Sequence, residues 1–577
     1  MIRERWRSKM VQARLIAIRN EFLMIAGSAL VVLSLAVPIS AQEIKPGGEA
    51  KPAPLALCSK GGEICLFAAV KDSAMDRAVA TWKSFFEERG GIVQVVPAGN
   101  EPKFPGIGAI MAFESEDICP VARQMKADLG GLKDARPESH LLLARNWNDR
   151  PLVLVVGKTS AGIDCGAARL LSKVACWGGK ISIHPGEELN KPFIDVRENM
   201  LCPSPDYDKW PSERLSAYPK FLKACGFNSV QIAEILTYWG HKGMTRENEA
   251  PALRAVAESA HKNGMLVSQF IWGCELVADT NLMKISAATY ADVVDHLITH
   301  WGDPGAGGYE VPQRMTVALL DEYRKINPKA RATVSTWANH KFWNGDRKAP
   351  AVLDETYSPK EIGIALHRWY DADGPVPPTD HYNTNPGENP KRGDIVLKAG
   401  RRLGIWGWYL GDHELGDGDY LRTRLLDKYF SSLLPPDVST KVDWISVEKV
   451  HHGNLSRINQ FVAGQKMWNP KQHLREIMMD YCRSMYGPVY ASTVCDAFEC
   501  AEAKSPQKFT KTNPPSDEFP DVTGDAAFSN RLDQVWVELQ KVQLPADWKP
   551  NFPDVGSVRN DIKELLLRCK PAKTTSK

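Results

Sequence analysis

Residues 227–273 read FNSVQIAEILTYWGHKGMTRENEAPALRAVAESAHKNGMLVSQFIWG. This stretch has an apolar run at 227–235, apolar residues at helical spacing over 247–264, and a second apolar run at 265–273. Short apolar runs predict buried strands, and the spacing between them predicts an amphipathic helix. A strand, a helix and a strand in this order predict two parallel strands joined by a crossover helix.

The same alternation continues on both sides of this stretch. A strand candidate, FIDVREN at 193–199, precedes a helical pattern at 212–226, and the run at 265–273 leads into another helical pattern at 286–298. Further strands are expected within ARATVSTWA (330–338), EIGIALHRWY (361–370), RRLGIWGWYLGD (401–412) and VDWISVEKVHH (442–452). Regular alternation over this length predicts an α/β chain with a (β/α)8 TIM barrel, placed at 191–465.

The flanking regions have patterns of their own. Residues 58–190 predict a small α/β domain with a hairpin at 140–157, whose turn is WNDR, a helix at 160–175 and a closing strand, KISIHP, at 180–185. Residues 466–577 predict a C-terminal helical region. The 577 residues are enough for two or three domains, and 43% hydrophobic and 24% charged residues are ordinary for a globular protein.

The N-terminus resembles an export signal. Residues 1–20 are basic, residues 21–40 are apolar, and ISA precedes Gln42, which predicts a signal peptide over 1–41 and a periplasmic or secreted protein. A retained membrane anchor is the alternative. Residues 42–57 are rich in Pro, Gly and Ala and predict a linker. Cleavage removes six basic and two acidic side chains, which lowers the formal charge from +3 to −1. That charge argues against nucleic acid as a partner.

All 12 cysteines follow residue 57, and in an exported protein Cys58 with Cys65 is the expected local disulfide. The cysteines show no Cys-x-x-Cys spacing, so a structural zinc site is not predicted. The pair His451 and His452 could bind a metal, but the sequence offers no spaced third and fourth ligand.

The expected strand ends share one trait, because each apolar run is followed by Trp or Tyr and then by polar or acidic residues. Eleven of the 17 tryptophans lie between residues 210 and 468. The carboxyl ends of barrel strands carry the active site of such folds. Tryptophan rings pack on the apolar faces of sugars while carboxylates accept hydroxyl protons, so the predicted ligand is a carbohydrate. The predicted contacts are Trp301, His300, Trp337, Arg368, Trp369, Trp406, Trp408, His451, Trp272 and Glu234.

Hydrolysis of a glycosidic bond needs two carboxyl groups, and the predicted catalytic set is Asp303, Glu448, and Asp412 or Glu414. Each has a structural alternative. Asp303 in HWGDPG is also a common way to begin a turn, and Asp412 and Glu414 in YLGDHELGDGD suit a solvated loop. Glu448 lies within the apolar run VDWISVEKV, where a buried carboxylate needs a partner or a function.

Two segments resemble a known group of enzymes. GKTSAGIDCGAARLLSKVA (157–175) resembles the end of the small α/β domain that precedes the barrel in α-glucuronidases and β-hexosaminidases. The stretch 459–492, with its MWNP step and a helix ending in YG, is similar to the barrel exit of α-glucuronidase-like proteins. The resemblance implies a glycosidase that acts from the carboxyl face of the barrel.

The resemblance does not extend to every catalytic motif. β-Hexosaminidases carry an adjacent Asp-Glu pair after the fourth strand, whereas HWGDPG offers Asp303 without a neighbouring Glu. The adjacent pair Asp354 and Glu355 comes later, in an expected loop. α-Glucuronidases use carboxylates on separate strands, which suits the set above better.

The sequence therefore predicts an exported glycoside hydrolase of the α-glucuronidase-like type, with a carbohydrate substrate and no cofactor. Two alternatives stay open: a non-catalytic carbohydrate-binding protein on the same scaffold, and a metal-dependent hydrolase or lyase that uses His451, His452 and Asp303. Neither the sugar nor the oligomeric state follows from the sequence.

Overall fold

The computed structural model describes most of the chain after residue 52. The described ranges are 53–99, 102–106, 108–201, 210–234, 246–272, 280–300, 310–335, 355–356, 358–367, 389–407, 421–433, 437–449, 455–504, 525–553 and 556–571. Residues 53–577 form one compact unit. The predicted signal segment lies outside the described residues. Within them, no helix is long and apolar enough to cross a membrane.

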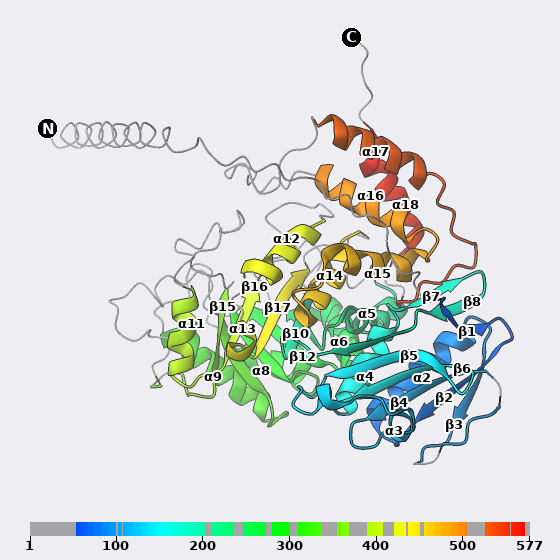
Figure 1. Ribbon diagram of the computed structural model, residues 1–577. Helices are drawn as coiled ribbons and strands as arrows, with labels where there is room; N and C mark the ends of the chain where they lie inside the picture. Colours follow the sequence, from blue (N-terminus) through cyan, green and yellow to red (C-terminus); the bar gives the residue numbers. More distant parts are fainter. Residues whose placement is uncertain are drawn as a thin grey trace, which may run out of the picture. The chain divides into compact units, whose positions relative to one another are not determined.

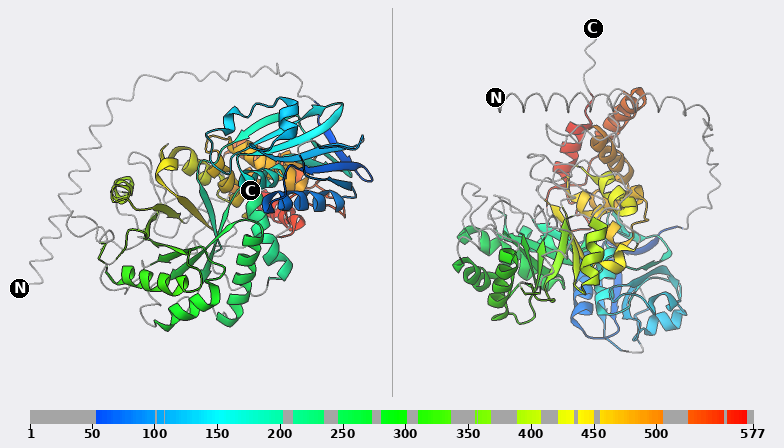
Figure 2. Two further views of the ribbon diagram at one scale, coloured as in Figure 1. Left: turned by 90° about the horizontal axis from the view of Figure 1, so that it is seen from below. Right: turned by 90° about the vertical axis from the view of Figure 1, so that its left-hand side faces the viewer.

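The centre of this unit is a closed barrel of eight parallel strands, as the alternation predicted (Figures 1 and 2). The strands are β10 Val196–Leu201, β11 Ser229–Glu234, β12 Leu266–Trp272, β13 His296–His300, β14 Arg331–Ser335, β15 Gly363–His367, β16 Leu403–Gly407 and β17 Trp444–Lys449. They pair in chain order, and β17 closes the barrel against β10.

Helices surround the barrel. They are α5 Ser212–Cys225, α6 Arg246–Lys262, α8 Asn281–Tyr290, α9 Glu310–Arg324, α11 Asn389–Lys398, α12 Thr423–Lys428, the π-helical turn Tyr429–Leu433, α13 Val438–Lys441 and α14 Arg457–Trp468. The expected helix at 286–298 is instead the end of α8 followed by β13: the helix ends at Tyr290, and Leu297 already belongs to the strand. The helix α14 ends at Trp468, beyond the expected barrel limit of 465.

The N-terminal part is a separate sheet with strand order β3-β2-β4-β6-β5-β9. Its elements are β2 Glu63–Ala68, α2 Ser73–Glu87, β3 Ile92–Val96, β4 Ala109–Ser115, α3 Pro120–Met125, the 3-10 turn Gly130–Leu132, β5 His140–Trp147, β6 Arg150–Gly157, α4 Ser160–Leu170 and β9 Gly186–Asn190. The predicted hairpin is confirmed, since β5 and β6 pair antiparallel. Its turn residues Asn148 and Asp149 both have positive φ, which these residue types tolerate.

Two predictions for this part need correction. The strand KISIHP does not close the main sheet. It is β8 Lys180–Ile183, and it pairs with β1 Leu55–Ser59 and β7 Val174–Trp177 in a small second sheet. The main sheet is closed by β9, whose sequence GEELN has no apolar run to reveal it. The strand β1 also begins inside the range expected to be a linker.

The predicted disulfide between Cys58 and Cys65 is absent, because both thiols are free. Cys58 belongs to the apolar cluster that includes Trp82 and Phe86, whereas Cys65 belongs to the cluster on the other face of the sheet. Side chains on opposite faces of a sheet do not reach each other, and strand neighbours alternate between those faces.

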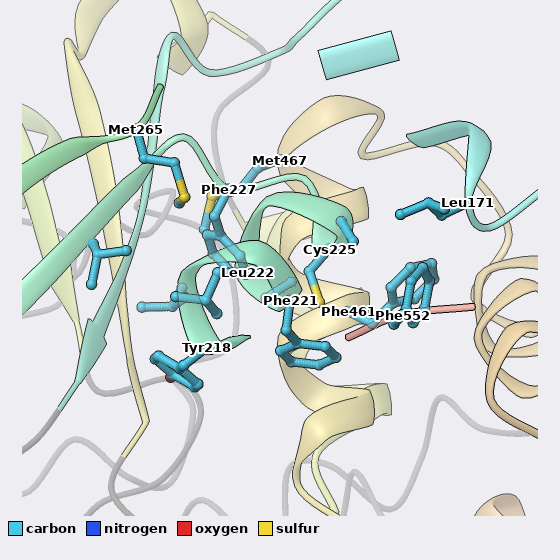
Figure 3. Close-up of a cluster of buried hydrophobic side chains, with 14 of the residues drawn as sticks. Leu171, Tyr218, Phe221, Leu222, Cys225, Phe227, Met265, Phe461, Met467 and Phe552 are labelled. Carbon is cyan, nitrogen blue, oxygen red and sulfur yellow. The ribbon is translucent and has the colours of Figure 1, made fainter. Parts of the chain in front are cut away.

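The C-terminal helices pack on the barrel and on the N-terminal part. They are α15 Leu474–Tyr486, α16 Ala491–Lys504, α17 Ala526–Leu539 and α18 Val558–Cys569. In the buried core between these parts, Phe552 lies 5.4 Å from Phe461 of α14 and 6.3 Å from Phe221 of α5, between ring centroids (Figure 3). A buried ion pair of Arg457 and Asp561, 2.5 Å apart, joins α14 to α18. This shared core fixes the barrel wall around β10 and α14.

Candidate active site

The carboxyl edge of the barrel is the candidate site, and four of the predicted residues have described main-chain positions there. Glu234, Trp272 and His300 are the last residues of β11, β12 and β13, and Glu448 is the penultimate residue of β17. Trp272 pairs with His300 in register, and Glu448 pairs with Met200. Parallel strands bring these four positions to one edge of the barrel.

The remaining predicted residues of the site lie outside the described residues. These are Asp303, Asp412, Glu414, Trp301, Trp337, Arg368, Trp369, Trp408, His451 and His452. The fourth barrel strand is β13, so Asp303 follows the fourth strand in the chain, as predicted.

Among the predicted site residues, Trp406 is the one whose side chain lies in the described part of the structure. It is 1% exposed and lies inside the barrel, in one apolar cluster with Met200 and Phe270. Its ring stacks on that of Phe270, with centroids 4.9 Å apart and planes 13° apart. This burial leaves almost no ring surface for a sugar. We therefore reassign Trp406 from a substrate contact to the interior wall beneath the site.

The barrel interior below Trp406 contains a buried carboxylate that the sequence interpretation missed. Glu198 of β10 is 1% exposed. Its Oε2 accepts a hydrogen bond from Ser229 Oγ at 3.0 Å and another from Ser268 Oγ, and its Oε1 accepts one from Gln231 Nε2 at 2.5 Å. Burial raises the pKa of Glu198, while the hydroxyl and amide donors around it act to lower that pKa.

The indole of Trp406 is joined to this carboxylate through one residue. Trp406 Nε1 donates to Gln231 Oε1 at 3.2 Å, and Gln231 Nε2 donates to Glu198. A tryptophan indole can only donate, so this contact sets which end of the Gln231 amide faces it. This series of hydrogen bonds crosses the barrel interior from Trp406 on β16 through Gln231 on β11 to Glu198 on β10.

A second polar group fills the interior near the amino ends of the strands. His296 of β13 contacts Thr333 Oγ1 through Nε2 at 2.8 Å, and its ring meets Trp444 edge-on at 5.7 Å. Burial lowers the pKa of His296 to about 3, so its ring is neutral near pH 7. Trp444 fits here because position 404 is glycine, and any side chain there would overlap its ring.

The N-terminal part contacts the opposite edge of the barrel near the amino ends of β10 and β11. Glu138 forms an ion pair with Arg197 at the start of β10 and accepts a hydrogen bond from Asn228 Nδ2 at 2.9 Å. Arg136 donates to the backbone oxygens of Phe193, at 2.9 Å, and Ser439, at 2.6 Å. These contacts lie near the amino ends of β10, β11 and β17, at the edge of the barrel opposite the candidate site.

Metal ligands do not gather in the described part of the chain. No group of three or more His, Cys, Asp or Glu side chains there has the geometry to hold an ion. His451 and His452 lie outside the described residues. What the described residues offer is a closed, hydrogen-bonded interior beneath a rim of strand ends.

Two of the missed residues had a usable signal. Gln231 and Ser268 lie in the mostly apolar runs SVQIAE and LVSQFIW, where a polar residue at an inward position is unusual. Glu198 had no such signal, because Val196 and Met200 are the only apolar residues of DVRENM, residues 195–200. Gln231 and Ser268 lie before the ends of their strands, where ligand contacts are expected in this fold.

Comparisons by sequence give no family. No family model matches the chain. No curated protein matches it either. Solved structures do match over most of their length. A GH138 enzyme targeting pectin rhamnogalacturonan II aligns with 88% of this chain and 86% of its own, with a TM-score of 0.53 and 11% identity. CpGH84B aligns with 91% of this chain and 89% of its own, with a TM-score of 0.55 and 12% identity. At these identities the likeness establishes the shared fold.

Proposed function

We propose that this protein is an exported glycoside hydrolase that acts from the carboxyl edge of its barrel. The observation that carries the proposal is the closed (β/α)8 barrel, in whose sequence the candidate carboxylates follow β13 and β16 and lie near the end of β17. The two similar structures, a GH138 enzyme and CpGH84B, are glycoside hydrolases with this architecture over nearly the whole chain. They support the reaction class, although a fold alone does not fix a function.

The strand pattern supports a role for Glu448 and His300. Each stands two residues beyond a residue of the barrel interior, Ser446 in β17 and Ile298 in β13. Residues two apart on a strand share a face, so we propose that Glu448 and His300 line the mouth of the barrel. Asp303 follows directly on the strand that holds His300.

The proposed chemistry uses two carboxyl groups. One protonates the glycosidic oxygen as the bond to the anomeric carbon breaks, and the other takes a proton from the attacking water or stabilises the oxocarbenium ion. The proposed set is Asp303, Glu448, and Asp412 or Glu414. Tryptophan surroundings of low polarity favour a raised pKa for the residue that acts as the acid.

The finer proposal concerns the substrate, which we take to be a poly- or oligosaccharide that contains a uronic acid. Arg368 offers a guanidinium suited to a bidentate contact with a uronate carboxylate. His300 and His451 would bind sugar hydroxyls. An α-glucuronidase-like activity is the specific form of this proposal, in line with the resemblance of residues 157–175 and 459–492.

A substrate screen tests the proposal. Purified protein is incubated with aryl glycosides and with acidic, neutral and amino-sugar oligosaccharides, and released sugar is measured for wild type and Asp303→Asn in parallel. We expect wild type to release a sugar from an acidic oligosaccharide and Asp303→Asn to release at least roughly a hundredfold less. Equal release by both proteins removes Asp303 from the catalytic set. Release from neutral sugars alone rejects the uronic-acid proposal and keeps the hydrolase.

A further inference from the structure

The interior of this barrel is unusual in what fills it. Barrel interiors of this fold are packed mainly by branched apolar side chains in layers. Here Glu198, Gln231 and Ser268 are each at most 2% exposed and lie on three consecutive strands, β10, β11 and β12. A buried carboxylate held by neutral donors costs folding free energy that an apolar side chain of similar size would not. The network is therefore poorly explained by stability.

The hydrogen bonds between these residues all run in one direction, from the indole donor of Trp406 to the carboxylate acceptor of Glu198. Glu198 accepts from Gln231, and Gln231 accepts from Trp406. The indole is held on its other side by the stacked ring of Phe270, 4.9 Å away. The hydrogen bond to Gln231 and the stacked ring of Phe270 together hold the indole in one orientation.

The position of Trp406 in β16 links its orientation to the neighbouring strands β15 and β17. It precedes the end of β16 by one residue, and it pairs in register with Ser446 and with His367. Ser446 is two residues before Glu448, and its main chain pairs in register with Glu198. The strands β16 and β17, which lead to the candidate carboxylates, thus both touch the network.

We propose that Glu198 and Gln231 are positioning residues: their hydrogen-bonded chain fixes Trp406 as a rigid base for the carboxylates at the barrel mouth. This inference rests on the proposed glycosidase function. Neither residue touches the substrate. They act through the ring of Trp406 and through Ser446, by keeping the ends of β16 and β17 in the geometry that the reaction needs.

A double-mutant cycle on the full-length protein tests the inference. Gln231→Leu removes the acceptor of the indole, and Trp406→Phe removes its donor. With the sugar that wild type releases most rapidly, we expect each variant to lower kcat roughly tenfold to a hundredfold while KM stays nearly unchanged, because only the transition-state geometry is lost. The double variant should lose no more than either single variant. Losses that multiply would overturn the inference.

Conservative rescue separates positioning from packing. Glu198→Gln keeps an amide oxygen that can accept from Gln231, so its kcat should stay within about threefold of wild type. Glu198→Leu fills the same space without an acceptor and should behave like Gln231→Leu. Equal kcat for Glu198→Leu and wild type would overturn the inference.

A spectroscopic readout keeps the test independent of turnover. With 5-fluorotryptophan incorporated, the ¹⁹F line of Trp406 is identified by its loss in Trp406→Phe. We expect this line to shift or broaden in Gln231→Leu and Glu198→Leu and to stay in place in Glu198→Gln. An unmoved line in all three variants would overturn the positioning role. If wild type hydrolyses no sugar, the glycosidase proposal fails. The ¹⁹F result still decides whether the hydrogen bonds of Glu198 and Gln231 orient Trp406.

Discussion

The two large sheets of this protein are filled in opposite ways. On one face of the N-terminal sheet, the buried cluster consists of apolar side chains such as Phe67, Ile110, Leu141 and Leu154. The interior of the barrel instead holds Glu198, Gln231, Ser268 and His296 among its apolar residues. The first interior gains stability mainly from apolar burial, although β4 also carries the buried carboxylate Glu114 near its end. The barrel interior buries less apolar surface and has directed hydrogen bonds instead. These hydrogen bonds specify the orientation of side chains beneath the candidate site.

The largest expected effect is a loss of apolar volume in the N-terminal sheet. Leu154 is fully buried, so Leu154→Ala should lower the free energy of unfolding by about 2 to 5 kcal/mol, measured by chemical denaturation. Leu189→Ala is the matched control, because that side chain on β9 is 43% exposed, and it should cost less than about 1 kcal/mol. Equal losses for the two variants would mean that this face is not a packed core.

The next effect concerns a carboxylate near the end of a strand in that sheet. Glu114 is fully buried and accepts from the backbone N–H groups of Val121 and Ala122 at 2.7 and 2.9 Å. Burial raises its pKa from 4.5 to about 7. The folded protein therefore holds this proton more tightly than the unfolded chain, so the associated stability is present below pH 4.5 and is lost as the pH rises to 7.

Glu114→Gln isolates this dependence. Relative to the variant, wild type should lose about 3 kcal/mol of unfolding free energy between pH 4.5 and pH 7, as measured by denaturation at several pH values. The variant has its own constant cost from weakened contacts to Val121 and Ala122, so the slope is the informative quantity. Parallel pH profiles for the two proteins would contradict the raised pKa.

A reciprocal pair of substitutions gives a smaller effect and tests the comparison itself. Thr333→Val removes the partner of His296 in the barrel, and Val156→Thr places a hydroxyl in the apolar cluster of the N-terminal sheet. Each leaves a buried polar atom without a partner, so each should cost about 1 to 3 kcal/mol of unfolding free energy. If Thr333→Val stabilises the protein instead, the polar filling of the barrel is not specified by its hydrogen bonds.

The fold was predictable because strands and crossover helices leave a strong apolar period. Six of the eight barrel strands lie within expected runs and β10 overlaps one, whereas β13 begins inside a segment that was expected to be helical. The strand β9 was not predicted, because its sequence GEELN is mostly polar. Its strand conformation depends on pairing with β5, which is distant in the sequence. The edge of the barrel that carries the site followed from the same alternation.

The residues of the site were less predictable, for a physical reason. Whether Trp406 contacts a ligand or the barrel interior depends on depth along the strand and on the ring of Phe270, neither of which a single run of sequence contains. The prediction of a disulfide between Cys58 and Cys65 was wrong for a similar reason, because the sequence alone does not show that the two side chains belong to different apolar clusters. Burial of Glu198 was not predictable either, because its neighbours in the sequence include Asp195, Arg197 and Asn199.

The most direct test of the central claim compares two identical substitutions at the two edges of the barrel. Glu448→Gln changes a carboxyl group near the carboxyl end of β17, and Glu361→Gln changes one just before β15 at the amino edge, where Glu361 pairs with Arg324 at 2.6 Å. On the sugar that wild type releases, kcat should fall at least roughly a hundredfold for Glu448→Gln and stay unchanged for Glu361→Gln. Full activity of Glu448→Gln would contradict a catalytic carboxylate at that strand end.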